Sequence, residues 1–277
     1  MDQSSPSESL SIQIVSDLHV EFYRFGIPDD IIIPSAPVLA LLGDIGLACT
    51  HSLRTFLLQQ SSRFQHVIFL AGNHEFYNLP GQTKSVSEQI EWMRNVCAER
   101  DNLHFLEQET INLNGVHICG ATLWSDIPDE FNELAERSLN DYRCSYNKSD
   151  GEEGLHRLRA TETTRWHKET VAWLTNELEE SKKRNQPVLV LTHHTPKLAG
   201  TSHPRHDGSE LTCCFLSELS HLLKSPVKVW ACGHTHHNFS MTEISGARLV
   251  SNQRGYFFRV EKNYLPDGLV LNISSTL

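Results

Sequence analysis

The chain has 277 residues, of which 39% are hydrophobic and 21% are charged, and these values are typical of a soluble globular protein. Its formal net charge of −10 argues against a protein that holds duplex nucleic acid, because phosphate binding needs a basic face. No run approaches the roughly 18 apolar residues of a membrane helix, and the amino terminus lacks a signal-peptide pattern, so we expect a cytoplasmic protein with no membrane partner.

The amino-terminal part of the chain alternates apolar runs with helical patterns. Residues 1–10 are polar and Ser-rich, which predicts a disordered tail, and residues 11–277 are predicted to form a single domain. Apolar positions at helical spacing predict helices over 53–64 and 83–100. Three short apolar runs are the predicted strands of this part: 11–16, 38–42 and 67–70. This β-loop-α-β order is typical of a sheet with crossover helices.

The middle of the chain is predicted to contain a hairpin and two helical segments. Asn114-Gly115 between apolar residues predicts the hairpin, since Asn-Gly is the strongest short-range hairpin signal. Residues 126–153 are polar, and we interpret them as a rim over the active site, with a short helix over 131–139 and no strand. The spacing of large apolar residues predicts the longest helix over 155–178.

The last third of the chain is predicted to be rich in β-strands, most of them antiparallel. Residues 197–212 are predicted to form an irregular loop, and residues 215–223 a short helix. Six segments are predicted strands: 188–191, 227–231, 239–244, 247–251, 256–261 and 268–273. Together the elements predict an α/β fold of two β-sheets with helices outside.

Five polar clusters each follow a predicted strand, which is where open α/β sheets place their ligands. The clusters are Asp17-Leu18-His19, Gly43-Asp44, Gly72-Asn73-His74-Glu75, the loop that begins with His193, and Gly233-His234-Thr235-His236. They contain seven candidate metal ligands, namely two carboxylates, one amide and four imidazoles. Such donors suit Mn, Fe, Zn or Co, and they suit Ca or Mg poorly.

The spacing within the clusters predicts how the donors are shared. Asp17 and His19 lie two residues apart, and the period of a strand puts both side chains on one side, so one ion can take both. The two carboxylate oxygens of Asp44 can bind two ions at once. His234 and His236 are again two residues apart, so each can serve a different ion.

The five clusters, in this order over residues 17–236, resemble the motifs of the calcineurin-like metallophosphoesterase family. The resemblance implies a four-layer α/β/β/α sandwich of two mixed β-sheets flanked by helices, with two transition-metal ions bound between the sheets. By this resemblance His74 is the catalytic histidine, which faces the substrate and binds no metal. The implied ligand sets are Asp17, His19, Asp44 and His236 for one metal, and Asp44, Asn73, His193 and His234 for the other.

The resemblance also implies the chemistry. Paired divalent ions clamp phosphoryl oxygens and lower the pKa of bound water to about 7. A metal-bound hydroxide is expected to attack phosphorus, while His74 protonates the leaving oxygen or stabilises the charge of the transition state. We therefore predict a metal-dependent phosphoric ester hydrolase, and a phosphodiesterase for a small phosphodiester or nucleotide in particular. The alternatives are a phosphomonoesterase with the same centre and a metal-binding interaction scaffold without turnover.

One departure from the family narrows the choice of substrate. In the protein serine/threonine phosphatase branch, an acidic residue and an Arg-Gly pair follow the Gly-Asp motif. Here Gly43-Asp44 is followed by Ile45, Gly46 and Leu47, which favours the small-molecule and phosphodiester branch. A nuclease would need a basic groove for the nucleic-acid backbone, and the acidic composition argues against one.

Several residues near the clusters have two possible roles. His193 and His194 both follow a strand, and the family's usual form favours His193 as the ligand. Glu75 is expected to be structural, and Trp124 and Tyr142 either line a leaving-group pocket or are buried. Four residues are predicted substrate contacts, with packing or a solvated loop as the alternative: His194, Arg205, Asn252 and Arg254. The metals, the physiological substrate and the oligomeric state are left open.

Overall fold

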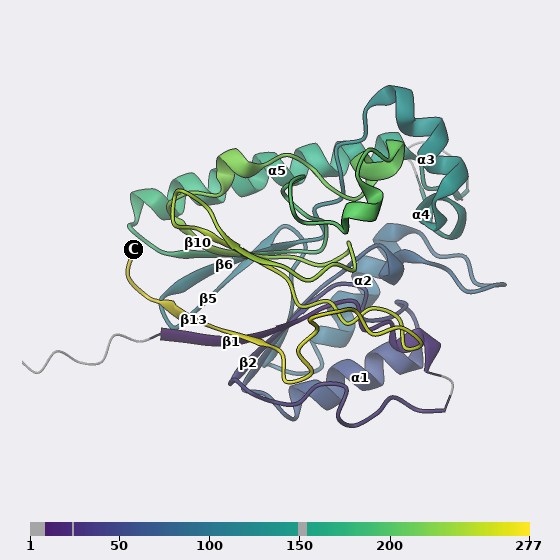
Figure 1. The fold of residues 1–277 in the computed structure, drawn as a ribbon. Coiled ribbons are helices and arrows are strands. Elements are labelled where there is room, and N and C mark those ends of the chain that lie inside the picture. Colours follow the sequence, from purple (N-terminus) through teal and green to yellow (C-terminus); the bar gives the residue numbers. More distant parts are fainter. Residues whose placement is uncertain (1–8, 24, 149–153) are drawn as a thin grey trace, which may run out of the picture.

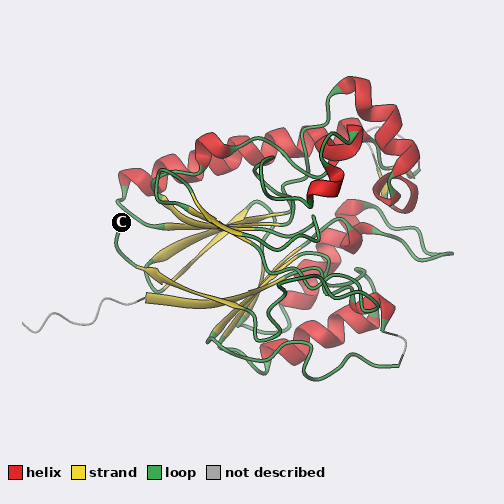
Figure 2. Cartoon of the chain, viewed as in Figure 1, coloured by secondary structure: helices red, strands yellow, loops and turns green. Residues whose placement is uncertain are grey.

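The computed structural model describes residues 9–277 apart from residue 24 and residues 149–153, so positions 1–8 of the predicted tail lie outside the described residues. Two β-sheets face each other, and helices cover their outer faces (Figures 1 and 2). The predicted α/β fold with two mixed sheets is therefore confirmed. Among the helices of the described part, none combines the length and the apolar composition that crossing a bilayer requires.

The first sheet has five strands in the order β13-β1-β2-β3-β4. Its strands are β1 (Ser9–Val15), β2 (Val38–Leu42), β3 (His66–Leu70), β4 (Leu103–Phe105) and β13 (Leu269–Ser274). The strands β1 to β4 are parallel, and β13 is antiparallel to β1. This pairing extends β1 to Ser9, which lies opposite Ser274, so the strand begins two residues earlier than predicted.

The second sheet has six strands in the order β11-β12-β10-β9-β6-β5. Its strands are β5 (Glu109–Leu113), β6 (Val116–Ala121), β9 (Val188–Thr192), β10 (Val227–Ala231), β11 (Ser240–Thr242) and β12 (Arg248–Val250). The hairpin of β5 and β6 turns at Asn114-Gly115, as predicted. The carboxyl-terminal strands are mixed rather than antiparallel, because β12 runs parallel to β10.

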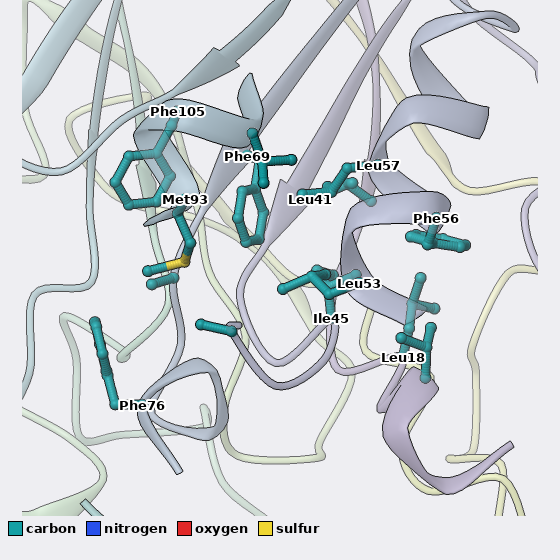
Figure 3. Close-up of a cluster of buried hydrophobic side chains, with 14 of the residues drawn as sticks. Leu18, Leu41, Ile45, Leu53, Phe56, Leu57, Phe69, Phe76, Met93 and Phe105 are labelled. Carbon is teal, nitrogen blue, oxygen red and sulfur yellow. The ribbon is translucent and has the colours of Figure 1, made fainter. Parts of the chain in front are cut away.

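Helices α1 (His51–Ser61) and α2 (Val86–Cys97) cover the five-stranded sheet, and α5 (Ala160–Lys183) covers the six-stranded sheet (Figure 1). A capping box between Ser85 and Glu88 fixes the start of α2. The apolar side of α1 packs on the sheet, where Leu53 and Leu57 meet Leu41 and neighbouring core residues (Figure 3). These buried faces hold the outer layers in place.

Three predicted elements differ in the structure. The longest helix begins at Ala160 rather than at 155, because the Glu162 carboxylate accepts the Arg159 N–H and because β8 (His156–Arg157) pairs with β7 (Tyr146–Asn147). The strand β7 also lies in the rim segment that was predicted to have none. Residues 256–261 form turns instead of a strand, with the Arg259 N–H donating to the Tyr256 carbonyl.

The predicted helix over 215–223 is also absent apart from one turn at Ser220–Leu222. The backbone N–H groups of Ser217 and Leu219 donate instead to the carbonyls of Thr195 and Pro196. This segment therefore packs along the loop that follows β9. The predicted short helix of the rim is α3 (Asn132–Ser138), and it is followed by α4 (Asn140–Cys144).

Candidate functional site

The seven predicted metal ligands converge at one edge of the two sheets. They follow the carboxyl ends of β1, β2 and β3 in the first sheet, and of β9 and β10 in the second. All of them are buried or nearly so. The seven are Asp17, His19, Asp44, Asn73, His193, His234 and His236.

The first group of donors lies around His19. Its Nε2 atom is 3.2 Å from Nε2 of His236 and 3.9 Å from Oδ2 of Asp44. His236 Nε2 is in turn 3.3 Å from Oδ1 of Asp17. Burial alone raises the pKa of Asp17, but the hydrogen bond and charge of His236 outweigh it and hold that pKa well below its usual range.

The second group of donors lies around His193. Its Nε2 atom is 3.1 Å from Oδ1 of Asn73, 3.1 Å from Nδ1 of His234 and 3.4 Å from Oδ1 of Asp44. Asp44 thus presents one oxygen to each group, as its predicted bridging role requires. The two groups match two of the three clusters of closely spaced donor atoms among the described residues.

Hydrogen bonds on the far side of the two central imidazoles show that the donor set fits cations. His193 Nδ1 is 2.8 Å from the Leu42 carbonyl, which can only accept, so the proton is on Nδ1 and Nε2 has a free electron pair. Glu21 fixes His19 in the same way, with Oε1 3.2 Å from Nδ1. With the neutral His193 ring, an electron pair on Nε2 faces the oxygen of Asn73 at 3.1 Å, and positive charge between the two atoms removes the repulsion.

Five of the seven candidate ligands have a left-handed backbone, and for Asp17 and His19 this corrects the predicted reason why their side chains lie together. Asp17 and His19 lie beyond the end of β1, with φ angles of 55° and 49°, so the pleat of a strand does not place them. Asp44, His234 and His236 also have positive φ. Asp and His are among the residues that adopt this conformation more often, and it typically costs about 1–3 kcal/mol.

Glu75 supports the two ligand loops of the first sheet, which agrees with its predicted structural role. Its buried carboxylate accepts the backbone N–H groups of Asp44, Ile45, Gly46 and Gly72 at 2.7–3.2 Å. Burial and the nearby charge of Asp44 raise the pKa of Glu75 to about 8, although these N–H groups lower it. A Cβ atom on Gly72 would lie 2.3 Å from Asp44 Oδ1, so only glycine fits beside this ligand.

His74 lies next to the donors, and Glu21 orients it. His74 Nδ1 is 3.1 Å from Glu21 Oε1, and Nε2 is 4.0 Å from Oδ2 of Asp44. Burial lowers the pKa of His74, but the charges of Asp44 and Glu21 and the hydrogen bond to Glu21 together raise it to about 9. Glu21 was not among the predicted site residues. Its signal was a carboxylate two residues beyond His19.

Asp141 and Tyr77 were also missed, and they hold Asn73. The Asn73 Nδ2 group donates to the Tyr77 hydroxyl at 2.9 Å and to Asp141 Oδ1 at 2.8 Å, while the Tyr77 hydroxyl donates to Asp141. Because Nδ2 is occupied, Oδ1 of Asn73 turns toward His193. Asp141 lies 68 residues along the chain from Asn73, so no local pattern indicated this contact.

The structure separates His193 from His194. The His194 ring packs between Trp124 and the ring of His234, and its Nδ1 atom is 3.3 Å from the Thr122 carbonyl. Burial and the charge of His193 lower the pKa of His194 well below its usual value. His194 therefore packs behind a candidate ligand and does not line the cavity that opens beside the donors, and its contact with substrate stays a prediction.

A cavity of about 370 Å³ opens beside the donors, between them and the two polar rim segments. Arg205 and Tyr256 line it, but Asn252 and Arg254 do not. Asn252 is 1% exposed, and its side chain bonds the backbone of Ile14 and Leu265.

The Arg254 guanidinium lies 5.6 Å above the Tyr23 ring. These contacts favour packing, the alternative role of Asn252 and Arg254, and their contact with substrate stays a prediction. Trp124 and Tyr142 are buried aromatics, which agrees with the second of their two predicted roles.

Comparisons with known proteins agree on one type of fold. A family model described as calcineurin-like phosphoesterase matches residues 10–238. The uncharacterized protein L509 of Acanthamoeba polyphaga mimivirus is 31% identical over 224 residues, which are 79% of this chain and 78% of that protein. Phosphopantetheinyl hydrolase (PptH) of Mycobacterium tuberculosis aligns with a TM-score of 0.65 and 20% identity over 91% of each chain. A dimetal phosphatase of Danio rerio aligns with a TM-score of 0.55 and 15% identity over 98% of this chain and 100% of that one.

Proposed function

Because the chain belongs to the calcineurin-like phosphoesterase family and is a metal-dependent phosphoester hydrolase, we propose that it hydrolyses a small phosphodiester or nucleotide. The observation that carries this proposal is Asp44, whose two oxygens each face one group of donors. The adjoining cavity has room for a leaving group larger than water. A phosphomonoesterase with the same donors is the alternative.

The donor set favours two transition-metal ions of the Mn, Fe, Zn or Co type, because imidazoles outnumber carboxylates in it. Asp17, His19 and His236 would hold one ion, and Asn73, His193 and His234 the other, with Asp44 shared. Such a pair supplies positive charge to the phosphoryl oxygens and acidifies water. Protonation of the leaving oxygen is left to a side chain of this protein.

His74 is the proposed proton donor. Its Nδ1–H bonds to Glu21, which leaves Nε2 on the side of Asp44, and the ring lines the cavity. A proton on Nε2 can pass to the oxygen that leaves phosphorus, and general acids typically contribute about 10²–10⁴-fold to the rate. Glu21 acts as a positioning residue, because it fixes the tautomer and orientation of this ring.

A substrate panel tests the proposal. We would strip the protein of metal, reload it with Mn, Fe, Zn or Mg, and compare bis-p-nitrophenyl phosphate, p-nitrophenyl phosphate, cyclic nucleotides and dinucleotides. A phosphopantetheinyl diester is added because the name of one structural neighbour mentions that group. We expect two bound ions per chain and faster hydrolysis of diesters than of monoesters. A preference for monoesters supports the alternative, and a metal-loaded protein that is inert on every substrate contradicts the proposal.

A non-catalytic scaffold is a second alternative from another functional class. His74 has a side chain that is 13% exposed, lines the cavity and is held by Glu21, which is the arrangement of a group that meets substrate. A scaffold has no need of an oriented histidine at the cavity. Metal binding without turnover in the panel would favour the scaffold.

A further inference from the structure

The cavity beside the candidate metal centre is lined by two chemically different sets of residues. Asp44 and Asp141 are the only carboxylates among the described residues that line it. Both are already engaged, Asp44 by the histidines and Asp141 by Asn73 and Tyr77. The loop that follows β9 contributes the cation Arg205, His206 and the hydroxyl-bearing residues Ser202, Ser209 and Thr212.

Arg205 is the only Lys or Arg among the described residues that line this cavity. Its Nε–H donates to Nε2 of His206 at 2.9 Å, so that nitrogen of His206 carries no proton. The backbone N–H of Arg205 donates to Nδ1 of His203 at 3.1 Å, which helps to fix the 3-10 turn Pro204–His206. Within the described part of the chain, the two terminal nitrogens of Arg205 make no hydrogen bond or ion pair.

Arg205 is exposed, and its terminal nitrogens have no partner among the described residues although carboxylates lie close to it in the chain. The chain carries ten more negative than positive formal charges, and Asp207 and Glu210 lie in the same loop. Neither of them lines the cavity or pairs with Arg205 in the described structure. A guanidinium offers two parallel N–H donors that match the oxygens of phosphate or carboxylate. The loop after β9 thus offers a guanidinium to an anion in the same cavity that the candidate metal ligands line.

We propose that Arg205 forms an anion subsite, and that the substrate carries a second phosphate besides the phosphoryl group that is cleaved. This inference rests on the proposed function, because it concerns the same cavity. The leaving group or the retained group then spans the space between the metal ligands and Arg205. A bisphosphate or a nucleoside with two separate phosphate groups has this chemistry, whereas a diester with a single anionic group does not.

Binding of two matched nucleotides tests the subsite without any turnover. Isothermal titration calorimetry on the metal-loaded protein compares thymidine 3′,5′-bisphosphate with thymidine 5′-phosphate. Charge-assisted hydrogen bonds predict that the bisphosphate binds about tenfold more tightly or better. Arg205→Ala should remove this difference, and Arg205→Lys should restore part of it. Arg184→Ala is the control, since Arg184 lies at the far end of α5 beside Glu180.

Rates of hydrolysis distinguish a failure of the Arg205 subsite from a failure of the proposed phosphodiesterase function. The substrates are thymidine 5′-(p-nitrophenyl phosphate) and the same compound with an added 3′-phosphate. We expect Arg205→Ala to raise KM for the second compound about tenfold more than it raises KM for the first. Equal binding of both nucleotides by the unaltered protein, or equal effects of Arg205→Ala on both substrates, overturns the subsite. Loss of hydrolysis with an intact binding difference contradicts only the proposed function.

Discussion

The two sheets contribute different chemistry to the same site. The five-stranded sheet supplies Asp17, His19, Asp44 and Asn73, and thus every oxygen donor, whereas the six-stranded sheet supplies three imidazoles. The first set is held by side-chain carboxylates, as Glu75 holds the ligand loops. In the second set, His193 and His234 also contact the first sheet, through the Leu42 carbonyl and the Asp17 carboxylate.

Contacts across this interface show that candidate ligands on each sheet depend on residues of the other sheet. His193, which follows β9, bonds through Nδ1 to the carbonyl of Leu42 in β2. The backbone N–H of His234 lies 3.2 Å from both carboxylate oxygens of Asp17. The ligands of each sheet are thus oriented by the other, so the site forms only when the sheets are packed together.

The largest expected effect on metal content and turnover comes from removing one of the three imidazoles of the six-stranded sheet. His193→Ala removes the donor at the centre of the second group, so we expect loss of one metal ion per chain. Turnover should fall on the order of a thousandfold, because a metal ion supplies several kcal/mol of transition-state stabilisation. Metal analysis and kcat/KM measure this. His221→Gln is the control, since His221 is exposed and lies outside both donor groups, and it should keep both ions; equal metal loss in the two variants contradicts the assignment of His193.

A smaller effect on kcat is expected from replacing Glu21, the carboxylate that orients His74. Glu21→Gln should lower kcat by roughly 10–100-fold on a diester with a poor leaving group, and His74→Ala by roughly a hundredfold or more. Both should act weakly on p-nitrophenyl esters, because p-nitrophenolate leaves without a proton. Rates on the two ester types measure this while metal content is monitored. An equal loss on both esters would mean that Glu21 acts through His19 instead.

The smallest effect concerns a carboxylate that joins the sheets away from the site. Glu107 accepts the N–H and hydroxyl of Thr122, and burial raises its pKa from 4.5 to about 7 despite these bonds. The folded state therefore binds the proton more tightly than the unfolded chain. This stabilisation is complete below pH 4.5 and is lost as the pH rises through 7.

Glu107→Gln keeps an acceptor for Thr122 but cannot ionise. Its free energy of unfolding should therefore vary less between pH 4.5 and 7, by on the order of 1–2 kcal/mol, because Glu107 is only partly buried. Urea unfolding at a series of pH values measures this. Parallel pH profiles for the two proteins would show that Glu107 ionises normally in the folded state.

The sequence allowed the strands that precede the site and the seven converging donors to be predicted, because both leave short local patterns. An apolar run followed by Asp, Asn or His can be recognised from a few consecutive residues, without knowledge of contacts between distant parts of the chain. The helix over 215–223 was wrong because its N–H groups bond to Thr195 and Pro196, which are distant in the chain. Glu21 and Asp141 were missed for a related reason, since their roles depend on His74 and Asn73.

The left-handed backbone at Asp17, His19, Asp44, His234 and His236 has a consequence for how this site can change over generations. If these residues bind cations as proposed, each position is restricted twice, once by the cation and once by the φ angle, which branched side chains such as Val and Ile adopt only with strain. A descendant freed from binding cations would still be held to the second restriction. At these positions it should carry mostly Gly and Asn. A relative that has lost metal binding could therefore still be recognised by these residues at the positive-φ positions.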